Sequence, residues 1–125
     1  MGKRIAIVTG AVKGIGKAIT DKFIAEDYIV IAVDVDEKSG KKLISQYGKE
    51  KILFAKANIS NEKTVHHLFE KILKKYGHID VLVNNAGIIR DNMIWNMPSE
   101  DLDMVMDINL KGVWLMCREC AKIMK

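Results

Sequence analysis

Three glycines stand near the start of the chain, between a short apolar run and an amphipathic stretch. The apolar run is "RIAIV" at residues 4–8, and the glycines are Gly10, Gly14 and Gly16 of "TGAVKGIG". A short β-branched segment that is apolar on both faces is typical of a strand buried in a parallel sheet. Glycines between such a strand and a helix let the backbone approach an anion at the helix N-terminus. The pattern therefore predicts a phosphate-binding turn, with an ordinary turn that binds nothing as the alternative.

Strands and helices are predicted to alternate along the rest of the chain. Further strands are expected at 28–33, 51–57 and 79–83, and helices at 15–27, between 35 and Gly48, from the N-cap Ser60 to Gly77, and from Pro98 to Lys125. Alternation of this kind produces parallel sheets with right-handed crossovers. We expect one domain over residues 1–125 with an α/β fold. Its sheet would be a Rossmann-like doubly wound parallel sheet of strand order 3-2-1-4, with helices on both faces and no further strands.

Helical spacing of apolar residues predicts which side of each helix is buried. The expected inward residues are Ile15, Ile19, Phe23 and Ile24 in the first helix, Val65, Leu68, Phe69, Ile72 and Leu73 in the third, and Leu102, Val105, Ile108, Val113 and Leu115 in the last. Residues 88–97 are expected to form a loop. Its Met93, Trp95 and Met97 would either pack against the protein or line a pocket for an apolar group.

The composition is that of an ordinary globular protein. Hydrophobic residues make up 49% of the chain, and the net charge of +4 comes from lysines spread along the sequence. A nucleic-acid-binding surface would cluster basic and aromatic residues on one face. No apolar run reaches the length of about 18 residues that a membrane span requires. We therefore expect no nucleic-acid partner, no membrane contact and a cytoplasmic location.

Cysteine and histidine residues suggest two possible metal or redox sites, and neither has a full set of ligands. Cys117 and Cys120 form "CREC" inside an apolar helical stretch, where packing thiols are expected and a redox pair is not. No second cysteine pair is present to complete a zinc site. His66 and His67 lie between the inward positions of their helix, so we expect both to face solvent and to bind no metal.

An acidic residue ends the second predicted strand. Asp34 follows "YIVIAV" and lies 34 − 16 = 18 residues beyond Gly16. A carboxylate at this position can accept hydrogen bonds from a ribose diol, and it repels a 2′-phosphate. The alternative is that Asp34 and Asp36 only cap a turn.

With these motifs in place, the chain resembles the short-chain dehydrogenase/reductase family. The stretch from Thr9 to Gly16 matches the family's Thr-Gly-x-x-x-Gly-x-Gly loop, and the "NNAG" of residues 84–87 matches its Asn-Asn-Ala-Gly motif. Asn109 in "INLKG" matches the asparagine of the family's active site. Within the family, the stretch from Asn84 to Leu110 looks most like the 3-oxoacyl-[acyl-carrier-protein] reductases.

The resemblance implies that a nicotinamide dinucleotide binds along the strand ends. The positions carried over are Gly10, Lys13, Gly14, Ile15 and Gly16 for the pyrophosphate, Asp34 for a ribose diol, Asn58 and Ile59 for the adenine, and Asn85, Ala86 and Gly87 for the ribose nearer the nicotinamide. Asn58 could accept a hydrogen bond from the adenine amine. A turn at the strand end is the alternative for Asn84 and Asn85. Asp34 favours NAD and Lys13 favours NADP, and we expect the carboxylate to prevail over the flexible, hydrated lysine.

The resemblance also implies a reaction, namely hydride transfer between the cofactor and a carbonyl or alcohol. That reaction uses a serine and a Tyr-x-x-x-Lys pair, and Asn109 would hold a water linked to the lysine. Tyr47 and Lys51 have the spacing, but Gly48 and a turn lie between them, so we expect no catalytic pair there. The chain alone is therefore expected not to turn over a small carbonyl or acyl substrate unless a second half completes it. The alternative function is a non-catalytic nucleotide-binding or oligomerising module.

Two apolar surfaces predict self-association into a homo-oligomer. The strand at 79–83 would be an unprotected edge of the sheet, and such edges pair with other chains. The helix at 100–125 would expose some combination of Val113, Leu115, Met116 and Cys117.

Overall fold

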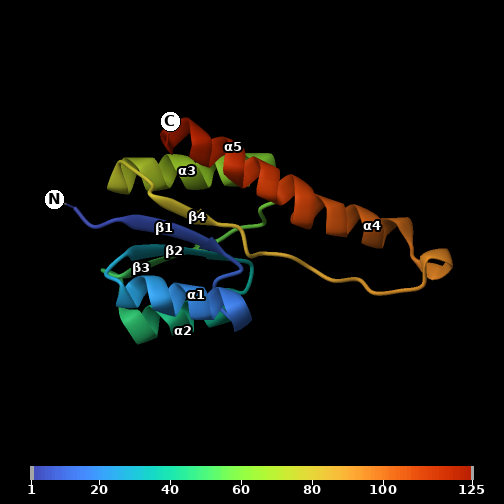
Figure 1. Ribbon diagram of the computed structural model, residues 1–125, viewed down its shortest axis with the longest axis horizontal. Helices are drawn as coiled ribbons and strands as arrows, with labels where there is room; N and C mark the ends of the chain where they lie inside the picture. The colour runs from blue at the N-terminus through green and yellow to red at the C-terminus, as the bar shows by residue number, and fades with distance from the viewer. Residues whose placement is uncertain (1, 125) are drawn as a thin grey trace.

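A four-stranded parallel sheet forms the centre of the computed structural model, which describes residues 2–124 (Figure 1). The strands are β1 (Ile5–Thr9), β2 (Ile29–Asp34), β3 (Ile52–Lys56) and β4 (Val81–Val83). Their order across the sheet is β3-β2-β1-β4, so the predicted topology is confirmed. The register pairs Thr9 with Val33 and Val8 with Val83, which brings the carboxyl ends of β1, β2 and β4 to the same edge.

Helices cover both faces of the sheet, as predicted for a Rossmann-like fold. The helices are α1 (Gly14–Ala25), α2 (Glu37–Tyr47), α3 (Glu62–Tyr76), α4 (Ser99–Met106) and α5 (Val113–Met124), with short helical segments η1 (Ile94–Asn96) and η2 (Asp107–Gly112). In Figure 1, α1 and α2 lie on one side of the sheet, and α3 and α5 lie on the other. The long loop that follows β4 extends away from the sheet, and so does α4.

The core has two parts because alternate residues of a strand point to opposite faces of the sheet. Ile5 and Ile7 pack with α3 and α5, while Val8 packs with residues of α2 and of the turn after β1. Leu115 and Met116 of α5 are fully buried in the first part. Of the four residues of which some combination was expected to be exposed, Leu115 and Met116 are therefore excluded, because α5 packs along α3 and turns them inward, and the inward position predicted for Leu115 is confirmed. Val113 is half-buried and Cys117 is exposed.

Two predicted inward residues of α1 and α3 are in fact exposed. Ile15 is 74% exposed and Leu73 is 45% exposed. Ile15 lies on a flank of α1 that forms an open apolar groove with Ile19 and Phe23, because no described element covers that flank. The other predicted inward residues of α1 and α3 are buried or half-buried. The predicted helix ends at Gly48 and Gly77 are confirmed, with φ angles of 85° and 81°.

The N-cap of α3 differs from the prediction by one residue. Asn61 caps the helix, and its side-chain oxygen accepts a hydrogen bond from Thr64 N at 3.0 Å. The hydroxyl of Ser60 instead donates to Asn58 Oδ1 at 2.7 Å. Both residue types are good caps, so the choice depends on the contact with Asn58.

The last predicted helix is interrupted. A π-helical segment of 6 residues, η2, separates α4 from α5. At the end of η2, a Cβ on Gly112 would lie 2.7 Å from Ile59 Cγ1. The backbone there lies so close to the loop after β3 that only glycine fits. Leu102, on α4, is exposed because α4 lies beyond the sheet. The predicted last residue of this helix, Lys125, lies outside the described residues.

β4 is an edge strand of the sheet, as predicted. Among residues 2–124, no helix has both the length and the apolar character needed to cross a membrane.

Candidate functional site

The carboxyl ends of the strands open onto one cleft of about 330 Å³. Most of the predicted cofactor-binding residues line this cleft, namely Gly10, Lys13, Asp34, Asn58, Ile59, Asn85, Ala86 and Gly87. Val33, Val35, Ala57, Ile88 and Ile108 complete the lining. Clefts at the carboxyl ends of parallel strands are where doubly wound folds bind ligands.

The glycine turn combines a close internal contact with open space. A Cβ on Gly16 would lie 1.8 Å from the carbonyl oxygen of Gly10 and 2.5 Å from Asn85 Nδ2, so only glycine fits. Gly14 has a φ of 59°, and no heavy atom lies within 4 Å of where its Cβ would be. Gly16 therefore serves the packing of α1 against the turn, while Gly14 leaves the entrance to the helix open.

The N-terminus of α1 is available to an anion. Lys13 is its N-cap residue and makes no capping hydrogen bond with its side chain, and the first turn contains no acidic residue. The first N–H groups of a helix have no partner within the helix, and the helix dipole makes this end positive. This end of α1, together with the open space at Gly14, fits a pyrophosphate group.

Thr9 connects the ends of β1 and β4. Its buried hydroxyl oxygen accepts hydrogen bonds from the backbone N–H groups of Asn85 and Ala86, both at 3.0 Å, and it donates to the carbonyl of Val83 at 3.4 Å. Asn85 Nδ2 donates to the carbonyl of Gly10 at 3.1 Å. From the sequence, Thr9 was predicted only as the first residue of the glycine motif. The available signal was a single hydroxyl at the end of an otherwise apolar strand.

The two aspartates after β2 have different roles. Asp36 caps α2, accepting from the backbone N–H and the hydroxyl of Ser39 at 3.1 and 2.7 Å, and these bonds lower the pKa of Asp36. Asp34 accepts from the backbone N–H of Asp36 through Oδ1 at 3.1 Å and lines the cleft. The capping alternative is therefore correct for Asp36, whereas Asp34 both closes the turn and faces the cleft.

Asn58 and Ile59 form the part of the cleft after β3. Asn58 is exposed, and its Oδ1 accepts from the backbone N–H of Ser60 at 3.0 Å and from its hydroxyl at 2.7 Å. Ile59 is buried beneath it. The oxygen that was expected to meet an adenine amine is thus already bonded to Ser60.

Asn109 holds the loop that follows β4. Its Oδ1 accepts from the N–H of Ile88 and its Nδ2 donates to the carbonyl of Ile88, both at 2.9 Å. A Cβ on Gly87 would lie 3.3 Å from Asn109 Oδ1, which is a tight contact. Each polar group of the side chain therefore makes one hydrogen bond to Ile88 and has capacity for one more. The role in holding a water stays a prediction.

Two of the three loop residues predicted to pack or to line a pocket, Met93 and Trp95, do neither. Trp95 is 76% exposed and Met93 is also exposed, because the loop projects from the sheet. Met97 is half-buried.

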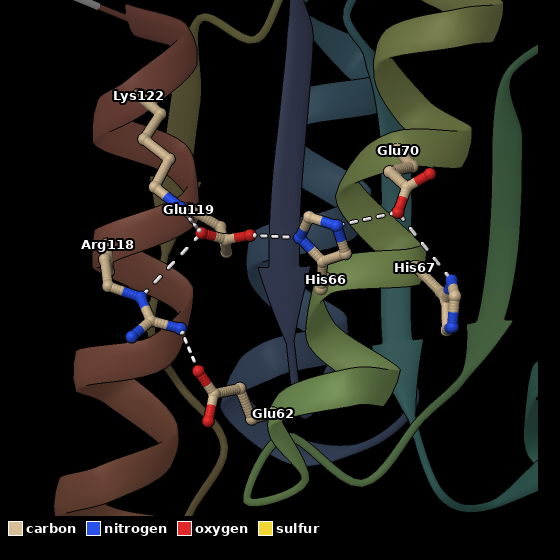
Figure 2. Close-up of polar contacts among 7 residues, drawn as sticks. All are labelled: Glu62, His66, His67, Glu70, Arg118, Glu119 and Lys122. Carbon is tan, nitrogen blue, oxygen red and sulfur yellow. Dashed lines mark hydrogen bonds and ion pairs between the residues drawn. The ribbon is translucent and has the colours of Figure 1, made fainter.

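A polar network outside the cleft joins α3 to α5 (Figure 2). His66 Nδ1 lies 2.8 Å from Glu119 Oε1, and His66 Nε2 lies 2.8 Å from Glu70 Oε1. Lys122 Nζ donates to Glu119 Oε2 at 2.6 Å. The Lys122 bond, followed by the His66 bond, lowers the pKa of Glu119, whose side chain is only 5% exposed. His66 is exposed as predicted, but it bridges two carboxylates. Within residues 2–124, no three His, Cys, Asp or Glu side chains are grouped to hold a metal ion.

Replacing Glu119 with glutamine is expected to lower the free energy of unfolding by about 1–2 kcal/mol at pH 7, because charge-assisted bonds to His66 and Lys122 are lost. The pKa of Glu119 is lower in the folded state, so its contribution is present above the unfolded pKa, near 4.5, and is lost as the pH falls through the folded value. Urea unfolding at a series of pH values measures this, with Glu100→Gln on exposed α4 as the control. A difference between Glu119→Gln and the unsubstituted protein that persists at the acid end would contradict the assignment.

Comparisons with known proteins agree with this geometry. The sequence model of the family described as short chain dehydrogenase matches residues 4–125. The chain is 40% identical over 113 residues to a 3-oxoacyl-[acyl-carrier-protein] reductase of Thermotoga maritima, covering 89% of this chain and 46% of that protein. It is 35% identical over 125 residues to the reductase of the same name from Escherichia coli, covering 97% and 49%.

Other relatives differ in the activities that their names state. The chain is 36% identical over 126 residues to a 3beta-hydroxysteroid dehydrogenase of Mediterraneibacter gnavus, covering 98% of this chain and 46% of that protein. The crystal structure of a short-chain dehydrogenase from Streptomyces avermitilis superposes with a TM-score of 0.93 at 22% identity, covering 99% of this chain and 45% of that one. The chain spans about half the length of the curated relatives it matches. Since the family match extends over nearly all of its residues, the chain belongs to the short-chain dehydrogenase family.

Proposed function

We propose that this chain is the cofactor-binding part of an NAD(P)-dependent oxidoreductase that transfers hydride to or from a carbonyl or alcohol. The observation that carries the proposal is the cleft, where the open N-terminus of α1 lies at the ends of the strands. A nicotinamide dinucleotide, when bound, supplies the hydride. The protein's task is to bind and orient it.

Each part of the cleft has a proposed role. Gly10 and Lys13 of the cleft, with the backbone of Gly14, Ile15 and Gly16 at the adjoining start of α1, surround the pyrophosphate, and the N–H groups of this first turn are the donors. Asn58 and Ile59 lie along the adenine ring of the cofactor. Asn85, Ala86 and Gly87 flank the ribose nearer the nicotinamide, and Asn109 positions them through Ile88.

NAD is the proposed cofactor, in preference to NADP. Asp34 Oδ1 is bonded to the N–H of Asp36, which leaves Oδ2 to accept from a ribose diol. A 2′-phosphate at the same place would meet a carboxylate, and two like charges at close range repel. Lys13 lines the same cleft, and its proposed partner is the pyrophosphate and not a 2′-phosphate.

Calorimetric titration with NADH and NADPH tests this function. The chain is expected to bind NADH at least about tenfold more tightly, and Asp34→Ala is expected to remove that preference. Asp36→Ala is the matched control, because Asp36 caps α2 and does not line the cleft, so it should lower stability and keep the preference. A chain that binds neither nucleotide would overturn the proposal.

We further propose that the chain alone binds the cofactor without turnover, and that a small carbonyl or acyl substrate, such as a 3-oxoacyl group, is reduced only when a second half completes the site. The Tyr47 hydroxyl donates to Asp21, and this bond raises the pKa of Tyr47 to about 12. A catalytic tyrosine requires a lowered pKa, so Tyr47 does not fit that role. A non-catalytic nucleotide-binding or oligomerising module remains the alternative, and activity on adding the second half of a relative discriminates between the two.

Self-association is also proposed, through a second copy of the chain. Met106, Leu110 and Trp114 are exposed at four-residue intervals and lie on successive turns of one helical stretch. β4 adds an exposed sheet edge. Light scattering over a concentration series is expected to show dimers or larger species that Trp114→Glu weakens. A monomer at every concentration would contradict this proposal.

A further inference from the structure

His66 lies between two carboxylates that belong to different helices (Figure 2). Its Nδ1 is 2.8 Å from Glu119 Oε1 on α5, and its Nε2 is 2.8 Å from Glu70 Oε1, one turn further along α3. An ionised carboxylate can only accept hydrogen bonds, so each contact needs a hydrogen on the ring nitrogen. A neutral imidazole has one N–H group, whereas an imidazolium has two. The arrangement therefore fits the charged form of His66.

Glu119 is the buried end of this bridge. Its side chain is 5% exposed, and its other oxygen, Oε2, accepts from Lys122 Nζ at 2.6 Å. The bonds from Lys122 and His66 lower the pKa of Glu119, so this side chain is negatively charged at neutral pH. A buried carboxylate is costly unless its charge is paired. Lys122 is on α5 itself, so the bond from His66 is the one that ties this buried charge to α3.

The charged groups that face His66 come from the same two helices, and their signs are evenly mixed: Glu62, Lys63, His67 and Glu70 on α3, and Arg118, Glu119 and Lys122 on α5. Arg118 pairs with Glu62 at 2.7 Å, and Lys122 pairs with Glu119. Within residues 2–124, Glu70 makes ion pairs with the two histidines alone, and His67 is the more distant of them at 3.8 Å. Glu70 is therefore the carboxylate that favours a second proton on His66.

We propose that His66 is a pH-sensitive clasp between α3 and α5. With hydrogens on both ring nitrogens, it joins Glu119 of α5 to Glu70 of α3 through two charge-assisted bonds. When the second proton passes to water, one ring nitrogen becomes an acceptor and can no longer bond a carboxylate. Glu70 is 59% exposed and can turn to solvent, whereas Glu119 is buried, so the remaining hydrogen stays on Nδ1. The helices stay packed, but the bond between them is weaker.

The clasp stabilises the folded protein at mildly acidic pH and weakens in alkaline solution. A second proton that is held in the folded state stabilises it fully below about pH 6.5, where a free histidine is charged, and this contribution is lost as the pH rises. It is lost again in acid when Glu119 is protonated. Because the pKa of Glu119 is lowered, that loss occurs below the ordinary value of 4.5.

Urea unfolding of His66→Gln tests the clasp. Glutamine is uncharged at every pH and cannot donate to both carboxylates as an imidazolium does. The substitution is expected to raise the unfolding equilibrium constant about tenfold at about pH 5.5 and only about twofold at about pH 8.5. His67→Gln is the matched control, because His67 is the next residue of α3, is 76% exposed and lies 3.8 Å from Glu70. Its effect should stay below about twofold at both pH values.

Glu70→Gln is a second variant at an exposed position. It keeps an oxygen that can accept from His66 Nε2 and removes the charge that favours the second proton. In the Glu70→Gln protein, the effect of His66→Gln should therefore differ less between the two pH values. An effect of His66→Gln that is equal at the two pH values, or larger at the alkaline one, would overturn the clasp. The clasp involves no residue of the cleft, so that outcome would leave the proposed function in place.

Discussion

Replacing Gly16 with alanine is expected to abolish dinucleotide binding and to lower the free energy of unfolding by about 3 kcal/mol. The added Cβ would lie 1.8 Å from the carbonyl oxygen of Gly10 and 2.7 Å from its carbonyl carbon. Both are backbone atoms, so no side chain can move aside to relieve the clash. Either α1 must shift away from the turn or the turn must change shape, and both remove the proposed pyrophosphate site.

Chemical denaturation and calorimetry with NADH measure the two effects. Gly77→Ala is the control, because Gly77 has a φ of 81°, no heavy atom lies within 4 Å of its Cβ position, and it ends α3 away from the cleft. That variant should lose about 1 kcal/mol from backbone strain and should bind as before. A Gly16→Ala protein with unchanged binding would show that the contact with Gly10 does not shape the site.

Replacing Thr9 with valine is expected to have the second-largest effect. Valine has nearly the same shape, so the change removes a hydroxyl and leaves the packing in place. The N–H groups of Asn85 and Ala86 then lose their acceptor at the end of β4. Unpaired N–H groups in a partly buried site cost about 1–3 kcal/mol, so we expect a loss near 2 kcal/mol and weaker NADH binding.

Thr20→Val provides the matched control. Thr20 is equally buried, but its hydroxyl donates to the carbonyl oxygens of Gly16 and Ala11, at 2.9 and 3.4 Å, and accepts no backbone N–H. A carbonyl that loses one donor retains a second lone pair for other partners, so the loss should be smaller and NADH binding should be retained. Equal effects of the two substitutions on NADH binding would mean that Thr9 contributes only to stability.

Most of the sheet and part of the site could be predicted from local sequence. "RIAIV" and "YIVIAV" are apolar on both faces, and the strands found there begin and end within about one residue of the prediction. Gly48 and Gly77 end their helices because each adopts a positive φ. Asp34 and the glycine turn reach the same cleft because the parallel strands that carry them end at the same edge of the sheet.

The remaining features depend on partners far away in the sequence. Asn109 and Ile88 are 21 residues apart, and Glu119 and His66 are 53 apart. Hydrophobic periodicity describes one element at a time, so it predicted a continuous helix where the structure has a π-helical segment. The last residue of that segment, Gly112, packs closely against Ile59 of a different element.

Local sequence is enough to predict the strands, their order and the position of the glycine turn, because these depend on side-chain alternation, glycine and the handedness of crossovers. Which atoms face the cleft depends on contacts made after folding. The side-chain oxygen of Asn58 is held by Ser60, and Asn85 is held by Thr9 and Gly10. A hydrogen bond has a direction, and that direction is set by where the partner lies after folding.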